Sequence, residues 1–213
     1  MQPVLIKQIA VGPMANFSYL IVDTGTKKAA YVDPGFESEK VMAVATKEAW
    51  QIEKILLTHT HFDHIQELET AYQKLKVPVY VHGFEISAIE EMGVSVKAVA
   101  TDEIIKVGNL SVKCLHMPGH TPGMICYLVE NHLITGDVLF VDGCGRVDLP
   151  GSSPEKMFET LKRLTQMPDD IIVYPGHDYG PKPTDTLGHQ KKTNPYLAAA
   201  AQGKDYFFGV RGV

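Results

Sequence analysis

The sequence has few cysteines, no long apolar run and no excess of basic charge. Its 213 residues include only three cysteines, an odd and sparse set that predicts a reducing compartment and no disulfide framework. The formal net charge of −5 is opposite in sign to that of most dedicated nucleic-acid or membrane-surface binders. No apolar stretch approaches the ~18 residues of a bilayer span. We therefore expect neither a nucleic acid nor a membrane as a partner.

Several catalytic and targeting signatures are missing as well. The sequence contains no G-x-S-x-G serine elbow and no G-x-x-x-x-G-K-[ST] phosphate loop. Its first residues, MQPVLIKQIA, lack a basic stretch followed by a long apolar core, so we expect no secretory signal and a cytoplasmic protein. The length and the ordinary apolar and charged fractions predict one folded domain over residues 1–213.

Short apolar, β-branched runs alternate with stretches of helical periodicity along the whole chain. Helices are expected over residues 37–49, 65–76 and 154–164. Strands are expected over residues 4–9, 19–22, 29–32, 54–58, 77–81, 103–108, 110–117, 124–129, 131–137 and 170–176. The close succession of strands in the middle predicts hairpins, and the mixture of elements predicts a layered α/β domain with mixed sheets.

Three histidines and an aspartate are crowded into LLTHTHFDHI, residues 56–65. Side chains alternate along an extended chain, so His59, His61 and Asp63 would point the same way if the chain stays extended after the preceding strand. His64 follows where the chain is expected to turn into a helix, and it can reach the same pocket from another side. Imidazole nitrogens and a carboxylate arranged in this way are typical ligands of first-row metal ions.

Three later segments repeat one pattern, in which an apolar run leads through a glycine to a candidate ligand: His120, Asp137 and His177. Glycine suits a backbone that turns sharply or approaches another group closely. Binding sites in layered α/β folds form beyond the carboxyl ends of strands, so these side chains are expected to converge on the segment 56–65. Seven candidate ligands exceed the four positions of one tetrahedral ion, which predicts two metal ions.

The motif H-x-H-x-D-H, a distant His, a Gly-Asp and a late Gly-His together resemble the metallo-β-lactamase fold superfamily over nearly the whole chain. The resemblance implies an αββα sandwich of two mixed sheets flanked by helices, with the site at one edge. It implies that the first metal is held by His59, His61 and His120. It implies that the second is held by Asp63, His64 and His177, with Asp137 bridging the two.

Two segments, DVLFVDGCGRVDLPGS and TLGHQKKTNPYL, are similar to the short, single-domain glyoxalase II-like hydrolases. The first also resembles the persulfide dioxygenases, which share a G-C-G-R-x-D sequence. Glyoxalase II itself carries a further C-terminal helical domain that contacts glutathione, and we expect this chain to lack it. Where the family commonly has Gly-Gly after the ligand motif, this chain has Gln66 and Glu67, which should alter the start of the next helix.

The resemblance implies hydrolysis of a thioester, with an S-acyl-glutathione as the candidate small-molecule substrate. Zinc is the expected metal, although nitrogen and oxygen ligands also suit iron or manganese. Asp63 and Asp137 are the expected catalytic carboxylates, the first because it can position the attacking water or accept its proton. Arg146 and Tyr179 are candidate substrate contacts, because they follow Asp137 and His177 closely in the chain.

Two other activities remain compatible with these residues. A mononuclear iron persulfide dioxygenase would use only His59, His120 and Asp137 as metal ligands. A non-hydrolytic redox member of the fold would exchange electrons with a flavin partner, although the sequence has no flavodoxin-like segment. The oligomeric state is left open, because the aromatic tail DYFFGVRGV suits packing against its own domain as well as a subunit contact.

The remaining polar residues have simpler interpretations. Three histidines are interpreted as solvated side chains: His82, His132 and His189. We interpret His116 as a structural residue or as one that supports a metal ligand, and Cys144 as a small buried side chain. Asp33, in the turn sequence VDPG, is interpreted as a turn residue that could also orient a ligand histidine.

Overall fold

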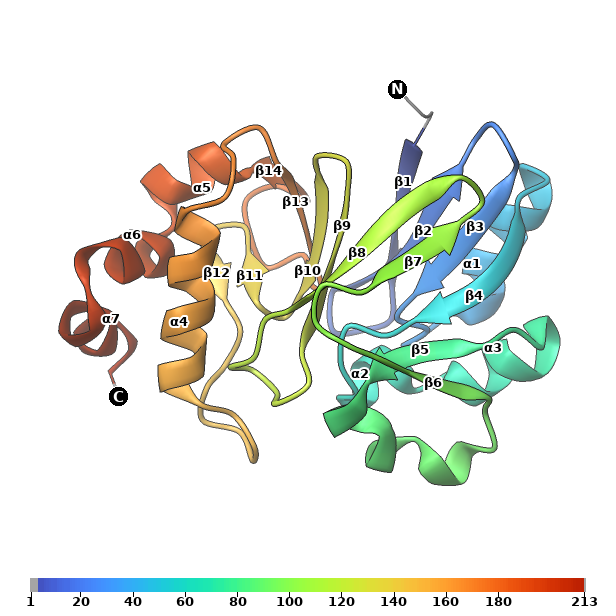
Figure 1. The fold of residues 1–213 in the computed structure, drawn as a ribbon, viewed down its shortest axis with the longest axis horizontal. Helices are drawn as coiled ribbons and strands as arrows, with labels where there is room; N and C mark the ends of the chain where they lie inside the picture. Colours follow the sequence, from blue (N-terminus) through green and yellow to red (C-terminus); the bar gives the residue numbers. More distant parts are fainter. Residues whose placement is uncertain (1–3, 213) are drawn as a thin grey trace.

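The structure, a computed structural model, describes residues 4–212 and contains two six-stranded sheets packed between layers of helices (Figure 1). The first sheet has the strand order β1-β2-β3-β4-β5-β6. Its strands are β1 (Val4–Val11), β2 (Asn16–Asp23), β3 (Lys28–Val32), β4 (Gln51–Leu56), β5 (Val79–His82) and β6 (Val96–Val99). The pairs from β1 to β3 are antiparallel and those from β3 to β6 are parallel.

The second sheet has the order β14-β13-β10-β9-β8-β7. Its strands are β7 (Ile104–Val107), β8 (Leu110–His116), β9 (Ile125–Val129), β10 (His132–Gly136), β13 (Ile172–Pro175) and β14 (Asp185–Thr186). The strands β7 to β10 form the predicted run of antiparallel hairpins, whereas β10 and β13 are parallel. A small separate hairpin joins β11 (Leu139–Phe140) and β12 (Gly143–Cys144).

Helices cover the outer face of each sheet (Figure 1). The first sheet carries α1 (Ser38–Lys47) and α3 (Leu68–Leu75), with α2 (Phe62–Ile65) and the 3-10 turns η1 (Gly83–Ala88) and η2 (Glu90–Met92) beside it. The second sheet carries α4 (Pro154–Thr165), α5 (Leu187–Thr193), α6 (Pro195–Gln202) and α7 (Lys204–Arg211). The predicted αββα sandwich is confirmed.

Alternating side chains divide the core into three apolar layers, as expected for strands covered on both faces. In β2, Ile21 points between the two sheets, and its neighbour Leu20 points toward the helices of the first sheet. In β10, Ile134 points between the sheets, and Leu133 points toward the helices of the second. All four side chains are fully buried. The strand pattern in the sequence therefore reflects burial on two sides.

Two local predictions differ from the structure. The helix expected from residue 65 begins only at Leu68, because Glu67 has a non-helical backbone and its carboxylate accepts a hydrogen bond of 2.7 Å from the amide of Ser38. The strand expected as the last one, β13, is followed by β14, and the helices α5, α6 and α7 were not anticipated. Within the aromatic tail, Phe207 packs against its own domain, fully buried beside Phe158, whereas Tyr206 is exposed.

Two parallel strand pairs determine where the functional residues meet. Val32 of β3 is paired with Leu56 of β4, and Gly136 of β10 is paired with Pro175 of β13. Because parallel partners end at the same edge, the segments that follow all four strands emerge together. No helix in the part of the chain that the structure describes is long and apolar enough to cross a membrane.

Candidate metal centre

The first two histidines follow β4 on a stretch of extended chain. This stretch ends at His61, whose backbone has φ −63° and ψ 146°. His59 is fully buried, whereas His61 is only partly buried at the edge of the centre. Potential ligand atoms of His59, His61 and His120 lie within 4.8 Å of one another. The alternation predicted for an extended chain thus places His59 and His61 on the same side.

Asp63 and His64 come from the short helix α2 instead. The helix begins at Phe62, so the extended run does not reach Asp63 and alternation does not account for its direction. Both side chains are buried, and their ligand atoms form a group with that of His177, again within 4.8 Å. One tight turn of helix therefore turns the second half of the motif toward a second group of donors.

The remaining donors follow the strands of the second sheet. His120 lies in the loop after β8, Asp137 directly follows β10, and His177 follows β13 after one glycine. All three side chains are buried. The glycine before His177 is required sterically, because a Cβ at Gly176 would overlap the carboxylate of Asp137. The structure thus brings all seven predicted side chains to one place.

Asp137 lies between the two groups of three. Its Oδ2 atom is 3.4 Å from Nε2 of His120 and also 3.4 Å from Nε2 of His177. Its Oδ1 atom is 3.3 Å from Nε2 of His64. Ligand atoms of His59, His64 and Asp137 form a third group within 4.8 Å. A carboxylate in this position can contact both halves of the centre.

Three of the imidazoles are oriented by a contact of Nδ1, the ring nitrogen that points away from the centre of the cluster. Nδ1 of His64 is 3.1 Å from Oδ2 of Asp33, so this turn residue, at φ 52°, orients a candidate ligand. Nδ1 of His120 donates to the carbonyl of Arg146 at 2.9 Å, and Nδ1 of His177 donates to the carbonyl of Met14 at 3.0 Å. Such contacts select the tautomer and leave Nε2 free to bind a metal ion.

The crowding shifts the ionisation of the cluster in opposite directions. Burial and the neighbouring His64 hold the pKa of His59 well below its ordinary value. Burial also disfavours charged His64, but Asp137 and Asp33 outweigh it and raise the pKa of His64. Burial opposes the charged form of Asp137, yet His64 and His177 hold its pKa well below the usual range. The anionic carboxylate of Asp137 and the neutral imidazole of His59 are therefore favoured, as metal binding requires, whereas His64 favours its charged form and must release a proton when a metal ion binds.

Two features of the donors fit metal ions. Nε2 of His59 is buried and has no hydrogen-bond partner among residues 4–212, which is costly unless the atom has another partner. Nε2 of His120 and Nδ1 of His61 are 2.9 Å apart, so two ring nitrogens are directed at the same small space. Both features are explained by a cation that accepts these lone pairs.

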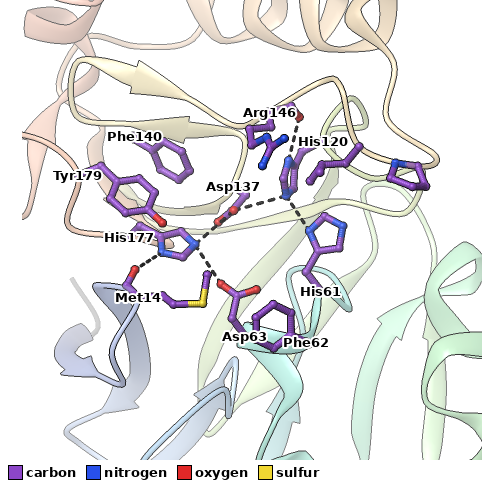
Figure 2. Close-up of a pocket in the computed structure, with 12 residues that line it drawn as sticks. Met14, His61, Phe62, Asp63, His120, Asp137, Phe140, Arg146, His177 and Tyr179 are labelled. Atoms are coloured by element: carbon purple, nitrogen blue, oxygen red, sulfur yellow. Dashed lines mark hydrogen bonds and ion pairs between the residues drawn. The ribbon is translucent and has the colours of Figure 1, made fainter.

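An open cavity of about 450 Å³ lies over the cluster (Figure 2). Five of the candidate ligands line it: His61, Asp63, His120, Asp137 and His177. Its wall is largely apolar and is made by Met14, Phe62, Phe140, Leu149, Pro150 and Tyr179. A cavity of this size with a few convergent polar groups suits a small organic molecule. No periodic pattern in the sequence indicates these wall residues, because they come from separate segments of the chain.

Arg146 and Tyr179, the two predicted substrate contacts, both line this cavity. The guanidinium group of Arg146 is exposed and pairs with Asp148 through contacts of 2.9 and 2.8 Å. The Tyr179 ring stacks on His177, with centroids 4.5 Å apart and planes 7° from parallel. Their position agrees with the sequence prediction, and their contact with a substrate stays a prediction.

Asn16 was missed from the sequence, although it contacts a candidate ligand. Its side-chain amide is buried and donates to Oδ2 of Asp63 at 2.9 Å. It lies at the start of β2, and its backbone forms a bridge with His177. The two residues are 47 positions apart in the chain, so no local sequence pattern predicts their contact.

The other polar residues singled out from the sequence lie outside the centre. The ring of His82 stacks on that of His116, 4.2 Å away. His132 contacts the Tyr174 hydroxyl, and exposed His189 contacts Asp185. Cys144 is buried as expected, and burial raises the pKa of its thiol to about 12, which makes it a poor nucleophile.

Comparison with known proteins identifies the family. The profile of the metallo-beta-lactamase superfamily matches residues 11–177, a span that includes all seven candidate ligands. The chain therefore belongs to the metallo-beta-lactamase superfamily. The resemblance predicted from the ligand motif is confirmed.

Individual relatives add detail. The chain is 33% identical over 198 residues to the probable polyketide biosynthesis zinc-dependent hydrolase BaeB of Bacillus velezensis, covering 92% of this chain and 87% of that protein. It is 36% identical over 166 residues to the hydroxyacylglutathione hydrolase of Rhodopseudomonas palustris, covering 77% of this chain and 63% of that protein. The crystal structure of ETHE1 from Myxococcus xanthus superimposes with a TM-score of 0.86 at 27% identity, covering 98% of this chain and 90% of that one.

Proposed function

We propose that this protein is a metal-dependent hydrolase of thioesters that uses two divalent ions. The observation that carries the proposal is the convergence of seven buried or partly buried donors in three overlapping groups. One ion needs four positions in a tetrahedral site, so one ion would leave part of this set unused. The relatives named as hydrolases support the reaction class.

Two of these three groups would each hold one ion. His59, His61 and His120 form the first group, and Asp63, His64 and His177 form the second. Asp137 would be shared, because its Oδ2 is equally distant from a histidine of each group. When bound, such ions lower the pKa of water toward neutrality and polarise a carbonyl group. The zinc named for BaeB supports zinc as the metal, with iron and manganese as the alternatives.

The protein itself supplies orientation and proton acceptance. The apolar wall of the cavity, which includes Met14, Phe62 and Phe140, would exclude water around the acyl group. Asp63, held by Asn16, would accept the proton of the attacking water. The thiol that leaves has a pKa of about 8.5, so it departs as a thiolate with little proton assistance. Hydrolysis of a thioester therefore requires less proton donation to the leaving group than hydrolysis of an amide.

The second candidate function is persulfide oxidation at a single iron. Two observations support this second function. One is the similarity to the ETHE1 structure, and the other is the G-C-G-R-x-D sequence from Gly143 to Asp148. That chemistry would need only His59, His120 and Asp137. It offers no reason for the second group, in which Asp63, His64 and His177 lie together.

Replacing His177 by Ala separates the two functions. The change removes one donor from the second group and leaves His59, His61 and His120 in place. Thioester turnover and oxygen consumption with glutathione persulfide are measured on both proteins, with zinc and iron quantified in each. His132→Ala is the matched control, since that half-buried histidine lies at the opposite end of β10 from Asp137.

The hydrolase proposal requires thioester turnover in the parent and in His132→Ala, and a fall of at least ~100-fold in His177→Ala. Persulfide oxidation that survives in His177→Ala, on an iron-loaded protein that leaves thioesters intact, would establish the second function in its place.

A further inference from the structure

Glu85 is a buried carboxylate that takes no part in the metal cluster. It lies in the 3-10 turn η1, between β5 and β6, and only 5% of its surface is exposed. Glutamate is rarely buried to this degree unless its charge is fully satisfied. Every contact made by its carboxylate is therefore informative.

The two oxygens of Glu85 bind two different loops. Oε2 accepts a hydrogen bond from the amide of Thr60 at 3.2 Å and another from the Thr60 hydroxyl. Oε1 accepts hydrogen bonds from the Thr121 hydroxyl at 2.7 Å and from the amide of Gly123 at 2.9 Å. The carboxylate thus joins one segment of the first sheet to one loop of the second.

Both segments carry candidate ligands of the same metal group. Thr60 lies between His59 and His61, and Thr121 directly follows His120. These three histidines form the first group of donors. They come from opposite sheets, so their relative position depends on contacts that connect the two loops, and Glu85 connects them through two hydrogen bonds to each loop.

The close approach of the His120 loop is built into the sequence. A Cβ at position 123 would lie 2.5 Å from Cγ and 2.7 Å from Oε1 of Glu85, so only glycine fits there without displacing the carboxylate. Gly123 and Glu85 are therefore sterically matched, which is expected where a fixed distance between two segments matters.

We propose that Glu85 is a positioning residue that sets the distance between the His59–His61 segment and the His120 loop, and so prepares the first group of donors for a metal ion. The proposal rests on the metal site proposed above, but not on the nature of the substrate. Because Glu85 does not itself touch the cluster, its effect is transmitted through Thr60 and Thr121.

Glu85→Gln is the most informative change, because it keeps the shape of the side chain. An amide has one accepting oxygen and one donating nitrogen, so its nitrogen must face the donors of one loop. The hydroxyl of Thr60 or Thr121 can rotate and accept a hydrogen bond from the amide nitrogen of the new side chain. The backbone amide of Thr60 or Gly123 can only donate, so it faces another donor. One loop therefore loses a hydrogen bond and is pushed away, without a cavity.

The test measures metal affinity and folding separately. Metal-free protein is titrated with zinc in competition with a chromophoric chelator, at a temperature far below melting, and the melting temperature of each metal-free variant is recorded. The variants are Glu85→Gln, Glu85→Ala and Gly123→Ala. The matched control is Glu90→Gln, an exposed glutamate five positions further along the same connection between β5 and β6.

We expect at least one zinc equivalent to bind about 10–100-fold more weakly in Glu85→Gln and Gly123→Ala, as for other groups that orient metal ligands. Glu90→Gln should match the parent. If Glu85→Ala fails to fold, Glu85→Gln decides. Variants that melt earlier without metal but bind zinc with parental affinity would show that Glu85 only stabilises the fold and would overturn the proposal. A parent that binds no zinc would overturn the metal site as well, whereas zinc binding without thioester turnover would overturn only the reaction.

Discussion

Gly176→Ala tests whether the cluster must be held in one geometry. A Cβ at position 176 would overlap Oδ1 of Asp137 and lie 3.0 Å from Cε1 of His64, whereas ordinary van der Waals contact begins near 3.4 Å. The His64 ring must therefore retreat by about 0.4 Å (3.4 minus 3.0), and the carboxylate must move further. Metal–ligand distances tolerate only about 0.2 Å.

The expected result is a large loss of function with a modest loss of stability. We expect metal affinity to fall by at least ~10–100-fold and turnover by about 100-fold, since a displacement near 1 Å has that effect on catalysis. Overpacking of this kind costs roughly 1–3 kcal/mol of folding free energy, which leaves the protein folded. Metal is quantified by elemental analysis and chelator competition, and stability by urea unfolding of the metal-free protein.

Gly83→Ala is the control, because a Cβ there meets nothing within 4 Å. It should bind metal and turn over substrate as the parent does. If Gly176→Ala also retained its metal and its activity, Asp137 and His64 would not need their observed positions, and the assignment of both as ligands would be refuted.

Three further predictions concern substrate, stability and pH. Arg146→Ala should raise KM for an anionic thioester and leave the melting temperature nearly unchanged, because its ion pair with Asp148 is exposed; a large loss of stability with unaltered kinetics would contradict this. Phe207→Ala should lower the free energy of unfolding by about 3–5 kcal/mol, since the ring is fully buried, without changing the metal content per folded chain. Although burial opposes its charge, hydrogen bonds from Lys182 and Gln190 hold the pKa of Asp185 at about 2, below its unfolded value near 3.9. The stabilisation by Asp185 is thus present above pH 4 and lost as pH falls toward 2, so the stability difference between the parent and Asp185→Asn in urea unfolding should shrink over that window; a constant difference would argue against it.

The positions of ten strands along the chain and the layered fold could be predicted because burial leaves a local pattern. Each of the ten expected strands corresponds to a strand of the structure, with ends shifted by a few residues. The helices α5, α6 and α7 were not expected, since their apolar faces are short and their burial depends on α4 and the second sheet. The helix expected from residue 65 was displaced by Glu67, whose partner Ser38 lies 29 positions away.

The ligand residues could be predicted from the sequence for a different reason. Metal chemistry allows few residue types, so histidines and aspartates placed after apolar runs stand out without any knowledge of their contacts. The direction of the Asp63 side chain could not be predicted from the sequence, because it depends on α2 beginning at Phe62. Asn16 and Glu85 were equally hidden, since ordinary polar residues acquire their role only from what they touch.

What the sequence by itself determined is therefore the set of chemical groups and the strands that carry them, both of which are recorded in residue type and local periodicity. The tertiary structure alone decided which donors form each group, because parallel pairing of β3 with β4 and of β10 with β13 brings their ends to one edge. It also decided what supports them, from the contact of Asp33 with His64 to the hydrogen bonds of Glu85. These contacts join residues far apart in the chain, and a physical interaction depends on distance in space, which the linear order does not contain.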